Sequence, residues 1–175
     1  MTLEQGLDAF VSPSLENVEI DLDIKLPGRE EELVAALRER DLVGRAMIST
    51  MELSSIARIG ELEPKLRRGW SYPKVTKEWS SRRWAKVPVL AALRVMRRRL
   101  PNIATQKLTR LGVSAMWVYH PLISPSLGNV CRRAGVELIA WKIDEEARMR
   151  ALLDSGATGI CSNDPQLFLN IRAGG

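Results

Sequence analysis

The fold of this chain is decided by the stretch Val18-Glu19-Ile20-Asp21-Leu22-Asp23-Ile24-Lys25-Leu26-Pro27-Gly28. Up to Leu26 its apolar and charged side chains alternate strictly, which is the period of a β-strand. One structure with this pattern is an antiparallel strand whose charged face lies in water. The other is a strand of a (β/α)8 barrel, whose outer face packs under helices and whose last residues open onto the active-site mouth. In such a barrel, Asp23 and Lys25 lie at the active end.

Length and composition restrict the class of protein. The chain has 175 residues, of which 45% are hydrophobic and 27% are charged, as is typical of a globular protein. It is long enough for one domain but shorter than the about 250 residues of a complete barrel. With no apolar run of the roughly 20 residues that span a bilayer and no signal peptide, we expect a cytoplasmic protein. Cys131 and Cys161 lack metal-ligand spacing, so we expect buried free thiols.

The net charge of +5 is unevenly distributed, with the basic excess mainly between residues 65 and 110. Such a region attracts nucleic acid or anionic lipid headgroups. The more ordinary interpretation is a solvated helix face. Nucleic acid is therefore not expected as a partner, and contact with a membrane surface stays an alternative.

Strands and helices alternate along the chain. We expect strands over 18–26, 44–50, 66–72, 113–119, 136–143 and 158–162, and helices over 2–10, 29–40, 52–62, 87–100, 105–111, 124–134, 145–154 and from Asp164 onward. Pro101 is expected to close the basic helix, and residues 72–86 read as a long loop that holds Trp79 and Trp84. Six strands alternating with helices predict a parallel α/β fold, and no nucleotide-binding glycine motif is present.

Polar or aromatic side chains follow the predicted strands at their carboxyl ends, where ligands bind in parallel sheets. These residues are Asp23, Lys25, Ser49, Thr50, Trp70, Tyr119, His120, Trp141, Ser162 and Asn163. Each has a structural explanation by itself: Trp141 as a core residue, His120 before Pro121 as a turn residue, and Ser162 as a cap. Their occurrence at all six strand ends favours a binding site.

Several of these segments resemble glycerophosphodiester phosphodiesterases. The segments Leu138-Ile139-Ala140-Trp141-Lys142-Ile143-Asp144 and Leu153-Asp154-Ser155-Gly156-Ala157-Thr158-Gly159-Ile160, closed by Ser162-Asn163-Asp164-Pro165, are similar to the family's V-W-T-V-N, L-x-x-G-V-D-G-I and T-N-D-P motifs. Thr2-Leu3-Glu4-Gln5-Gly6-Leu7 resembles its P-T-L-E-E-x-L helix, Asp21-Leu22-Asp23-Ile24-Lys25 its N-I-E-I-K strand, and Ala46-Met47-Ile48-Ser49-Thr50-Met51 its V-I-I-S-S-F strand. The likeness runs from end to end and is weakest over residues 73–110.

The resemblance implies metal-assisted hydrolysis of glycerophosphodiesters to glycerol 3-phosphate and an alcohol, on a (β/α)8 TIM-type barrel. It implies that Asp23 binds a divalent cation, calcium or magnesium, that Lys25 contacts the phosphate, and that Trp141 lines the mouth against the glycerol. Asp23 stands where the family has glutamate, so its carboxylate is one methylene shorter. Asp144 and Lys142 likewise replace the asparagine and threonine of the family strand.

The family's H-R-G and E-x-D motifs, which supply the acid, the base and further metal carboxylates, have no counterpart here. His120 is the only histidine and matches no catalytic one, whereas cleavage needs both a proton acceptor and a proton donor. We therefore expect residues 1–175 to form a single, partial barrel domain with about six of eight βα units and an insertion over about 73–110. We expect such a chain to be a truncated or incompletely recorded member of the family, or a remnant, and to be catalytically impaired. We expect its open barrel edges to favour self-association.

Three functions compete. The first is phosphodiesterase activity on a small glycerophosphodiester in glycerophospholipid metabolism. The second is a noncatalytic domain that binds phosphate or anionic headgroups through Lys25, Trp141 and the basic loop. The third is a membrane-surface or nucleic-acid module that uses residues 65–110.

Overall fold

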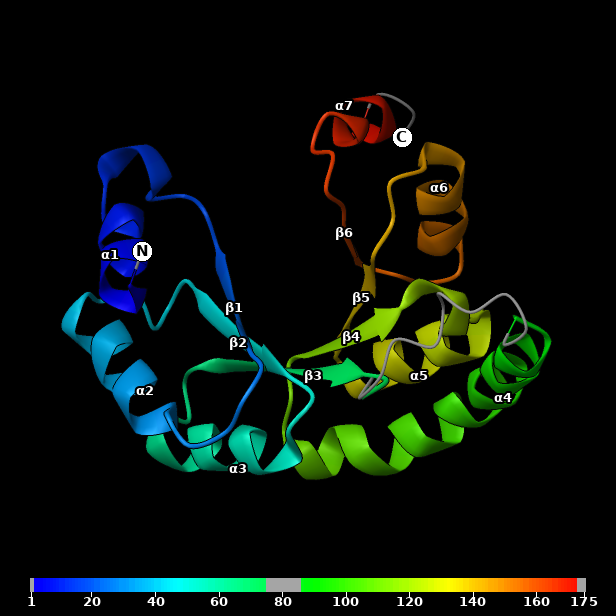
Figure 1. Ribbon diagram of the computed structural model, residues 1–175, viewed down its shortest axis with the longest axis horizontal. Coiled ribbons are helices and arrows are strands. Elements are labelled where there is room, and N and C mark those ends of the chain that lie inside the picture. The colour runs from blue at the N-terminus through cyan, green and yellow to red at the C-terminus, as the bar shows by residue number, and fades with distance from the viewer. Residues whose placement is uncertain (1, 75–85, 173–175) are drawn as a thin grey trace. The chain divides into compact units, whose positions relative to one another are not determined.

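The computed structural model of the chain describes residues 2–74 and 86–172. Its elements are α1 (Leu3–Phe10), η1 (Pro13–Leu15), β1 (Ile20–Ile24), α2 (Glu30–Glu39), β2 (Ala46–Thr50), α3 (Leu53–Leu62), β3 (Arg67–Tyr72), α4 (Lys86–Leu111), β4 (Ala115–Tyr119), η3 (His120–Leu122), α5 (Pro125–Ala134), β5 (Glu137–Trp141), α6 (Glu146–Asp154), β6 (Gly159–Cys161) and α7 (Leu167–Arg172). Strands and helices alternate as the sequence predicts (Figure 1). Two compact units are formed: unit 1 comprises Met1–Trp70 and Leu111–Ser114, and unit 2 comprises Ser71–Arg110 and Ala115–Gly175.

The strands of unit 1 pair in parallel. β1 pairs with β2 and β2 with β3, so that Asp23 lies opposite Ser49 and Ser49 opposite Gly69. The antiparallel interpretation of the first strand is therefore wrong. The predicted α/β fold class is confirmed, because parallel strands are joined by helices.

The apolar face of β1 builds the core of unit 1. Ile20 is 6% exposed and belongs to a buried cluster, against which Leu22 and Ile24 pack. The cluster also contains Leu7, Leu33, Val34, Ala36, Leu37, Leu42, Ala46, Ile48, Ile59 and Leu66, which come mainly from α1, α2, β2 and α3. Because strand side chains alternate, burial of this face turns Asp21 and Asp23 to the opposite face. The helices thus cover one side of the strand and leave the charged side for a site.

Unit 2 repeats the parallel arrangement. β4 pairs with β5 and β5 with β6, which places Tyr119 opposite Trp141 and Trp141 opposite Cys161. Helix α5 begins after Ser124, whose side chain accepts a hydrogen bond from Leu127 N, and it ends at Gly135 in the left-handed region with φ of 66°. These two caps fix where α5 begins and ends, and therefore where the following strand, β5, begins.

Helix α4 differs from the prediction. It runs unbroken through Pro101, whereas the sequence predicts that this proline separates two helices. Leu100, Ala104 and Leu108 are each at most 1% exposed, and they repeat at helical spacing across the proline. Burial of this stripe outweighs the about 3 kcal/mol that an interior proline costs a helix.

The two cysteines differ in exposure. Cys131 is buried, as expected, and burial raises the pKa of its thiol to about 11. Cys161 is exposed, contrary to expectation, because it is the last residue of the short strand β6, which is only partly covered. The predicted loop over residues 72–86, with Trp79 and Trp84, falls largely outside the described residues. Within residues 2–74 and 86–172, no helix is long and apolar enough to cross a bilayer.

Candidate functional site

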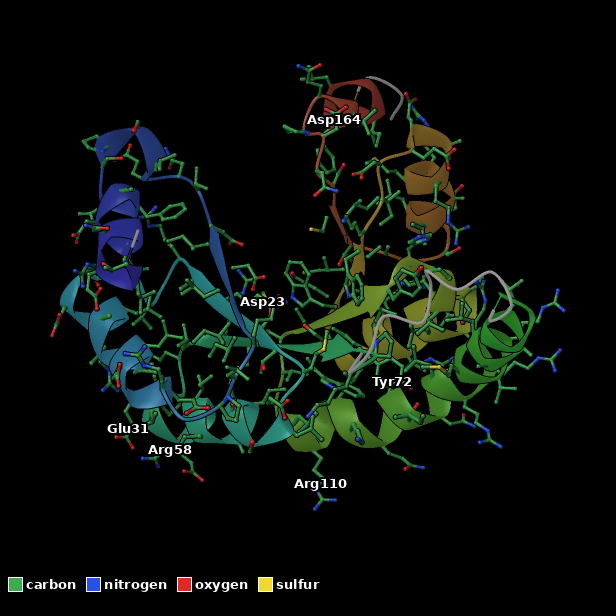
Figure 2. All side chains as sticks on the ribbon, viewed as in Figure 1. Asp23, Glu31, Arg58, Tyr72, Arg110 and Asp164 are labelled. Carbon is green, nitrogen blue, oxygen red and sulfur yellow. The ribbon has the colours of Figure 1, made fainter. Side chains whose placement is uncertain are left out.

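The charged face of β1 presents two carboxylates, with a lysine directly after the strand. Lys25 forms an ion pair with Asp23 Oδ2, and the two side chains are 71% and 43% exposed. Figure 2 labels Asp23 on β1. Solvent screens so exposed a pair, so it adds little stability and leaves the ammonium group accessible to an anionic ligand.

Asp21 lies on the same face and was not predicted as a site residue. Its Oδ2 accepts a hydrogen bond from Ser49 Oγ at 2.9 Å. Although the residue as a whole is exposed, protein atoms crowd its carboxyl group, and this desolvation raises the pKa of Asp21 to about 6. The Ser49 hydrogen bond lowers the pKa, whereas the charge of Asp23 raises it further. A carboxyl group with this pKa can exchange a proton near neutral pH.

The other hydroxyl at the end of β2 has a structural role. Thr50 is fully buried, and its Oγ1 donates to Ile24 O at 2.8 Å and accepts from Glu52 N at 3.1 Å. Trp70 lies opposite Thr50 in the sheet and is 4% exposed, so it faces away from the side that carries Ser49. The prediction that Trp70 contributes to the ligand edge is therefore wrong, because strand alternation turns it into the core.

A buried carboxylate holds the loop that follows Lys25. Glu30 is 7% exposed, and its Oε1 accepts a hydrogen bond from Ser55 Oγ at 2.5 Å. Its Oε2 accepts from Gly28 N at 2.9 Å. The Ser55 hydrogen bond is the main reason that the pKa of Glu30 is lowered. Glu30 thus ties the end of the first βα loop to α3.

In unit 2, aromatic rings gather at the carboxyl ends of β4 and β5. The ring centroids of Tyr119 and Trp141 lie 5.2 Å apart, with the rings tilted by 40°. The Tyr119 and His120 rings meet edge to face at the same distance of 5.2 Å. Trp141 is only partly buried, so the predicted aromatic group at the end of β5 stays partly accessible to solvent.

His120 begins the short helix η3, in agreement with the turn interpretation. Its Nδ1 accepts a hydrogen bond from Arg148 Nε at 3.3 Å, so the neutral ring carries its proton on Nε2. Burial lowers the pKa of His120, and the Arg148 charge lowers it further. The ring is therefore held in its neutral form beside Tyr119.

Asp144 joins the ends of β5 and β6. Its Oδ1 accepts hydrogen bonds from Ser162 Oγ at 2.9 Å and Asn163 N at 2.8 Å, and its Oδ2 accepts from Asn163 Nδ2 at 2.8 Å. The Asn163 and Ser162 hydrogen bonds hold the pKa of Asp144 below its usual value. Ser162 and Asn163 thus serve as turn and capping residues, as their structural interpretation predicts.

The donor set does not by itself make a cation site. Calcium and magnesium take six or more oxygen ligands, usually including several carboxylates or waters. Within the described part of the chain no three histidine, cysteine, aspartate or glutamate residues gather, and Asp23 is already paired with Lys25. These residues are too few to fit a divalent cation without further ligands.

The predicted site residues fall in both units. Asp23 and Lys25 lie together in unit 1, where Asp21 joins them, and Trp141 lies in unit 2 beside Tyr119. Within each unit these groups stand at or directly after the carboxyl ends of parallel strands. The alternation of β1 could have identified Asp21, because it shares a face with Asp23. The combination of all three predicted residues in one site stays a prediction.

Comparisons with known proteins agree with this architecture. A model of the Glycerophosphoryl diester phosphodiesterase family matches residues 3–167. A glycerophosphodiester phosphodiesterase of Caldanaerobacter subterraneus subsp. tengcongensis is 29% identical over 164 residues, or 92% of this chain and 57% of that protein. The chain therefore spans little more than half the length of this curated relative.

Two solved structures share the fold. One, of a glycerophosphodiester phosphodiesterase from Parabacteroides distasonis, has a TM-score of 0.71 and 17% identity and covers 98% of this chain and 65% of that one. The other is an Oleispira antarctica phosphodiesterase in complex with the product sn-glycerol-3-phosphate, with a TM-score of 0.63 and 16% identity over 98% of this chain and 61% of that one. At these identities the likeness shows the fold alone.

Proposed function

Because this chain belongs to the glycerophosphoryl diester phosphodiesterase family, we propose that it acts on glycerophosphodiesters as a phosphoric diester hydrolase, releasing glycerol 3-phosphate and an alcohol. The observation that carries this proposal is the family match over residues 3–167. The product bound to the Oleispira antarctica relative supports a small glycerol phosphate as the ligand. Since the chain covers 57% of the curated relative, the activity of whole relatives is proposed for it.

Lys25 is the proposed phosphate ligand. Its ammonium group is exposed, and its one ion pair is with the exposed carboxylate of Asp23. An anionic phosphate would compete for this cation at little cost, because a solvent-exposed pair contributes only about 0–1 kcal/mol. Trp141, supported by Tyr119 at 5.2 Å, is proposed to line the glycerol part.

Asp23 is the proposed cation ligand, and it needs oxygen ligands beyond those that the described residues gather around it. If it binds calcium or magnesium, either ion should raise the melting temperature of the wild-type chain and not that of Asp23→Asn, because ligands that bind only the folded state stabilise it. An equal rise in both proteins would contradict this role.

Catalysis by this chain alone is proposed to be impaired. The chain holds one histidine, and the Nδ1 of His120 is occupied by Arg148 at 3.3 Å. Hydrolysis needs one group to accept a proton and another to donate one. The alternative function, a noncatalytic domain for phosphate or anionic headgroups, is supported by the same observation. The predicted single domain and cytoplasmic location stay predictions.

The experiment measures hydrolysis and binding separately on the purified chain. Release of glycerol 3-phosphate from glycerophosphocholine is followed with calcium or magnesium, and binding of glycerol 3-phosphate is followed by calorimetry. We expect binding without turnover above background, and we expect Lys25→Gln to weaken binding by about tenfold, the loss of one charge-assisted hydrogen bond.

Arg29→Gln is the matched control, since Arg29 is an exposed cation that pairs with Glu32, three residues further along the chain. It should leave binding unchanged. Rapid turnover would contradict the impairment and favour a complete phosphodiesterase. Failure to bind glycerol 3-phosphate would contradict both the enzyme and the binding-domain proposals.

A further inference from the structure

Helix α4 has a one-sided charge composition. All charged residues among its 26 are basic: Lys86, Arg94, Arg97, Arg98, Arg99, Lys107 and Arg110. Four of these arginines fall within six consecutive positions. Figure 2 shows nitrogen-tipped side chains extending outward along this helix, with Arg110 labelled near its end.

These arginines differ from others in the chain by their partners. Arg38 pairs with Glu63 at 2.8 Å and Arg40 with Asp8 at 2.7 Å, so each charge is locally balanced. Among the residues that the structure describes, no carboxylate lies within ion-pair distance of Arg94, Arg98 or Arg99. All three are exposed. Their charge is therefore directed to solvent.

Arg97 is held differently, and it marks the border of a hollow. Its Nη1 donates to Pro121 O at 3.0 Å. The hollow has a volume of about 730 Å³ and is lined by Leu90, Ala91, Leu93, Arg94, Arg97 and Pro121. Apolar walls with a cationic edge suit an acyl or glycerol group below an anionic headgroup.

Large apolar side chains are exposed among these arginines. Leu90 is 62% exposed and Val95 is 49% exposed. The buried side of the helix is formed by Leu100, Ala104 and Leu108. At 100° per residue, Val95 projects to the opposite side. Arg94 and Arg98 flank Val95 on one side, and Arg99 flanks it on the other. By the same count Leu90 lies about 140° from Val95, on the side of the buried stripe, where it lines the hollow. The exposed face thus combines one aliphatic group, Val95, with Arg94, Arg98 and Arg99.

We propose that the first half of α4, residues 90–99, binds the surface of an anionic lipid bilayer. The arginines attract the negative headgroups, and Val95, which lies between them, enters the boundary with the acyl chains. Charge complementarity would also attract nucleic acid, but single strands are bound through aromatic stacking, and residues 90–99 contain no aromatic residue. The lipid surface accounts for both the charged and the aliphatic groups, and it does not depend on the proposed hydrolase activity.

Vesicle cosedimentation with the full chain tests this proposal. The vesicles contain phosphatidylcholine alone, or phosphatidylcholine and phosphatidylglycerol in equal amounts. The wild-type chain should bind only the anionic vesicles, and binding should weaken as salt is added. In Arg98→Gln/Arg99→Gln the affinity should fall about fivefold for each arginine, or roughly 25-fold in all.

Arg132→Gln/Arg133→Gln is the matched control, because it removes two adjacent, exposed arginines from α5. Both double variants lose two positive charges, so a general effect of net charge is the same in both. The control variant should change vesicle binding less than about twofold. Val95→Ser should also weaken vesicle binding while leaving retention on a heparin column unchanged. Circular dichroism establishes that every variant is folded.

Three results would overturn the proposal. The first is no binding of the wild-type chain to anionic vesicles at low salt. The second is an equal loss in the two arginine double variants, which would show that only net charge matters. The third is tighter binding to DNA or RNA than to vesicles, together with no effect of Val95→Ser on vesicle binding.

Discussion

At the residue scale, Asp21 shows how the fold sets the charge of a side chain. It occupies the face of β1 that alternation assigns to charged groups, one strand away from the Ser49 hydroxyl. Crowding by protein atoms raises its pKa from 3.8 to about 6, against the effect of the Ser49 hydrogen bond. Asp21 of unit 1 is therefore a carboxyl group whose pKa approaches neutral pH.

This shift predicts a pH dependence of stability. A carboxyl group with a raised pKa binds its proton more tightly in the folded state, so between pH 3.8 and about 6 the folded state holds more protons than the unfolded chain. The contribution of Asp21 to the free energy of unfolding therefore falls as pH rises through this window. We expect Asp21→Asn to be more stable than wild type by about 1 kcal/mol at pH 7, after allowance for solvent screening. Near pH 4 the difference should vanish, which urea unfolding at the two pH values measures.

Ser49→Ala provides a companion measurement. The Ser49 hydrogen bond lowers the pKa of Asp21, so its removal should move the midpoint of the Asp21 carboxyl titration upward in an NMR experiment. A wild-type midpoint near the ordinary aspartate value would contradict the crowding argument.

At the element scale, Gly128 of α5 and Gly156 of the turn after α6 allow the two backbones to pack closely. The backbone of this turn leaves no room at Gly128: an added Cβ would lie 2.4 Å from Ser155 O and 3.0 Å from Gly156 Cα. Both neighbours are backbone atoms, so the helix would have to move. We expect Gly128→Ala to lower the free energy of unfolding by about 1–3 kcal/mol in urea titrations.

Gly44→Ala is the control for this substitution. An added Cβ at Gly44 meets nothing within 4 Å. Its free energy of unfolding should stay within about 0.5 kcal/mol of wild type or rise slightly, because alanine restricts the unfolded chain. Equal costs at both glycines would show that packing at Gly128 is not the cause.

The proline inside α4 gives a second prediction at this scale. Pro101 removes one backbone hydrogen bond from a helix that is held by its buried stripe. Pro101→Ala should therefore raise the free energy of unfolding by about 1–3 kcal/mol. Pro125→Ala serves as the comparison, because Pro125 stands in the first turn of α5, where proline is favoured. It should be neutral or slightly destabilising, and the same gain at both positions would contradict the argument.

At the scale of the whole molecule, the edge of β1 predicts self-association. Among the strands that the structure describes, β2 is the only one that pairs with β1. Beside this edge lies a hollow of about 400 Å³, with Leu3, Phe10 and Val18 in its lining, and Val18 is 41% exposed. An unpaired strand edge with apolar surroundings favours pairing with another chain.

Sedimentation equilibrium tests this expectation. The wild-type chain should associate as its concentration rises, and Val18→Lys should shift the equilibrium to monomer, because an edge lysine opposes strand pairing. Val11→Lys introduces the same charge at a valine that is 52% exposed and outside the hollow, and it should have no such effect. A wild-type chain that stays monomeric at all concentrations would show that the edge is protected.

The sequence alone determined the order of strands and helices, because apolar periodicity and capping residues act over a few neighbours. Thr2 and Gln5 form a capping box at the start of α1, with side-chain hydrogen bonds of 3.3 and 2.9 Å. The motifs of residues 138–165 and 21–25 likewise indicated the family. The alternation of β1 also placed Asp23 and Lys25 on one face at the end of the strand.

Only the tertiary structure decided the features that depend on distant neighbours. Pro101 stays within a helix because its stripe is buried, Trp70 turns into the core because of its register with Thr50, and Cys161 is exposed at the end of a short strand. The raised pKa of Asp21 likewise follows from atoms that are far away in the sequence. Burial is the sum of contacts from many segments, so no local pattern of residues contains it.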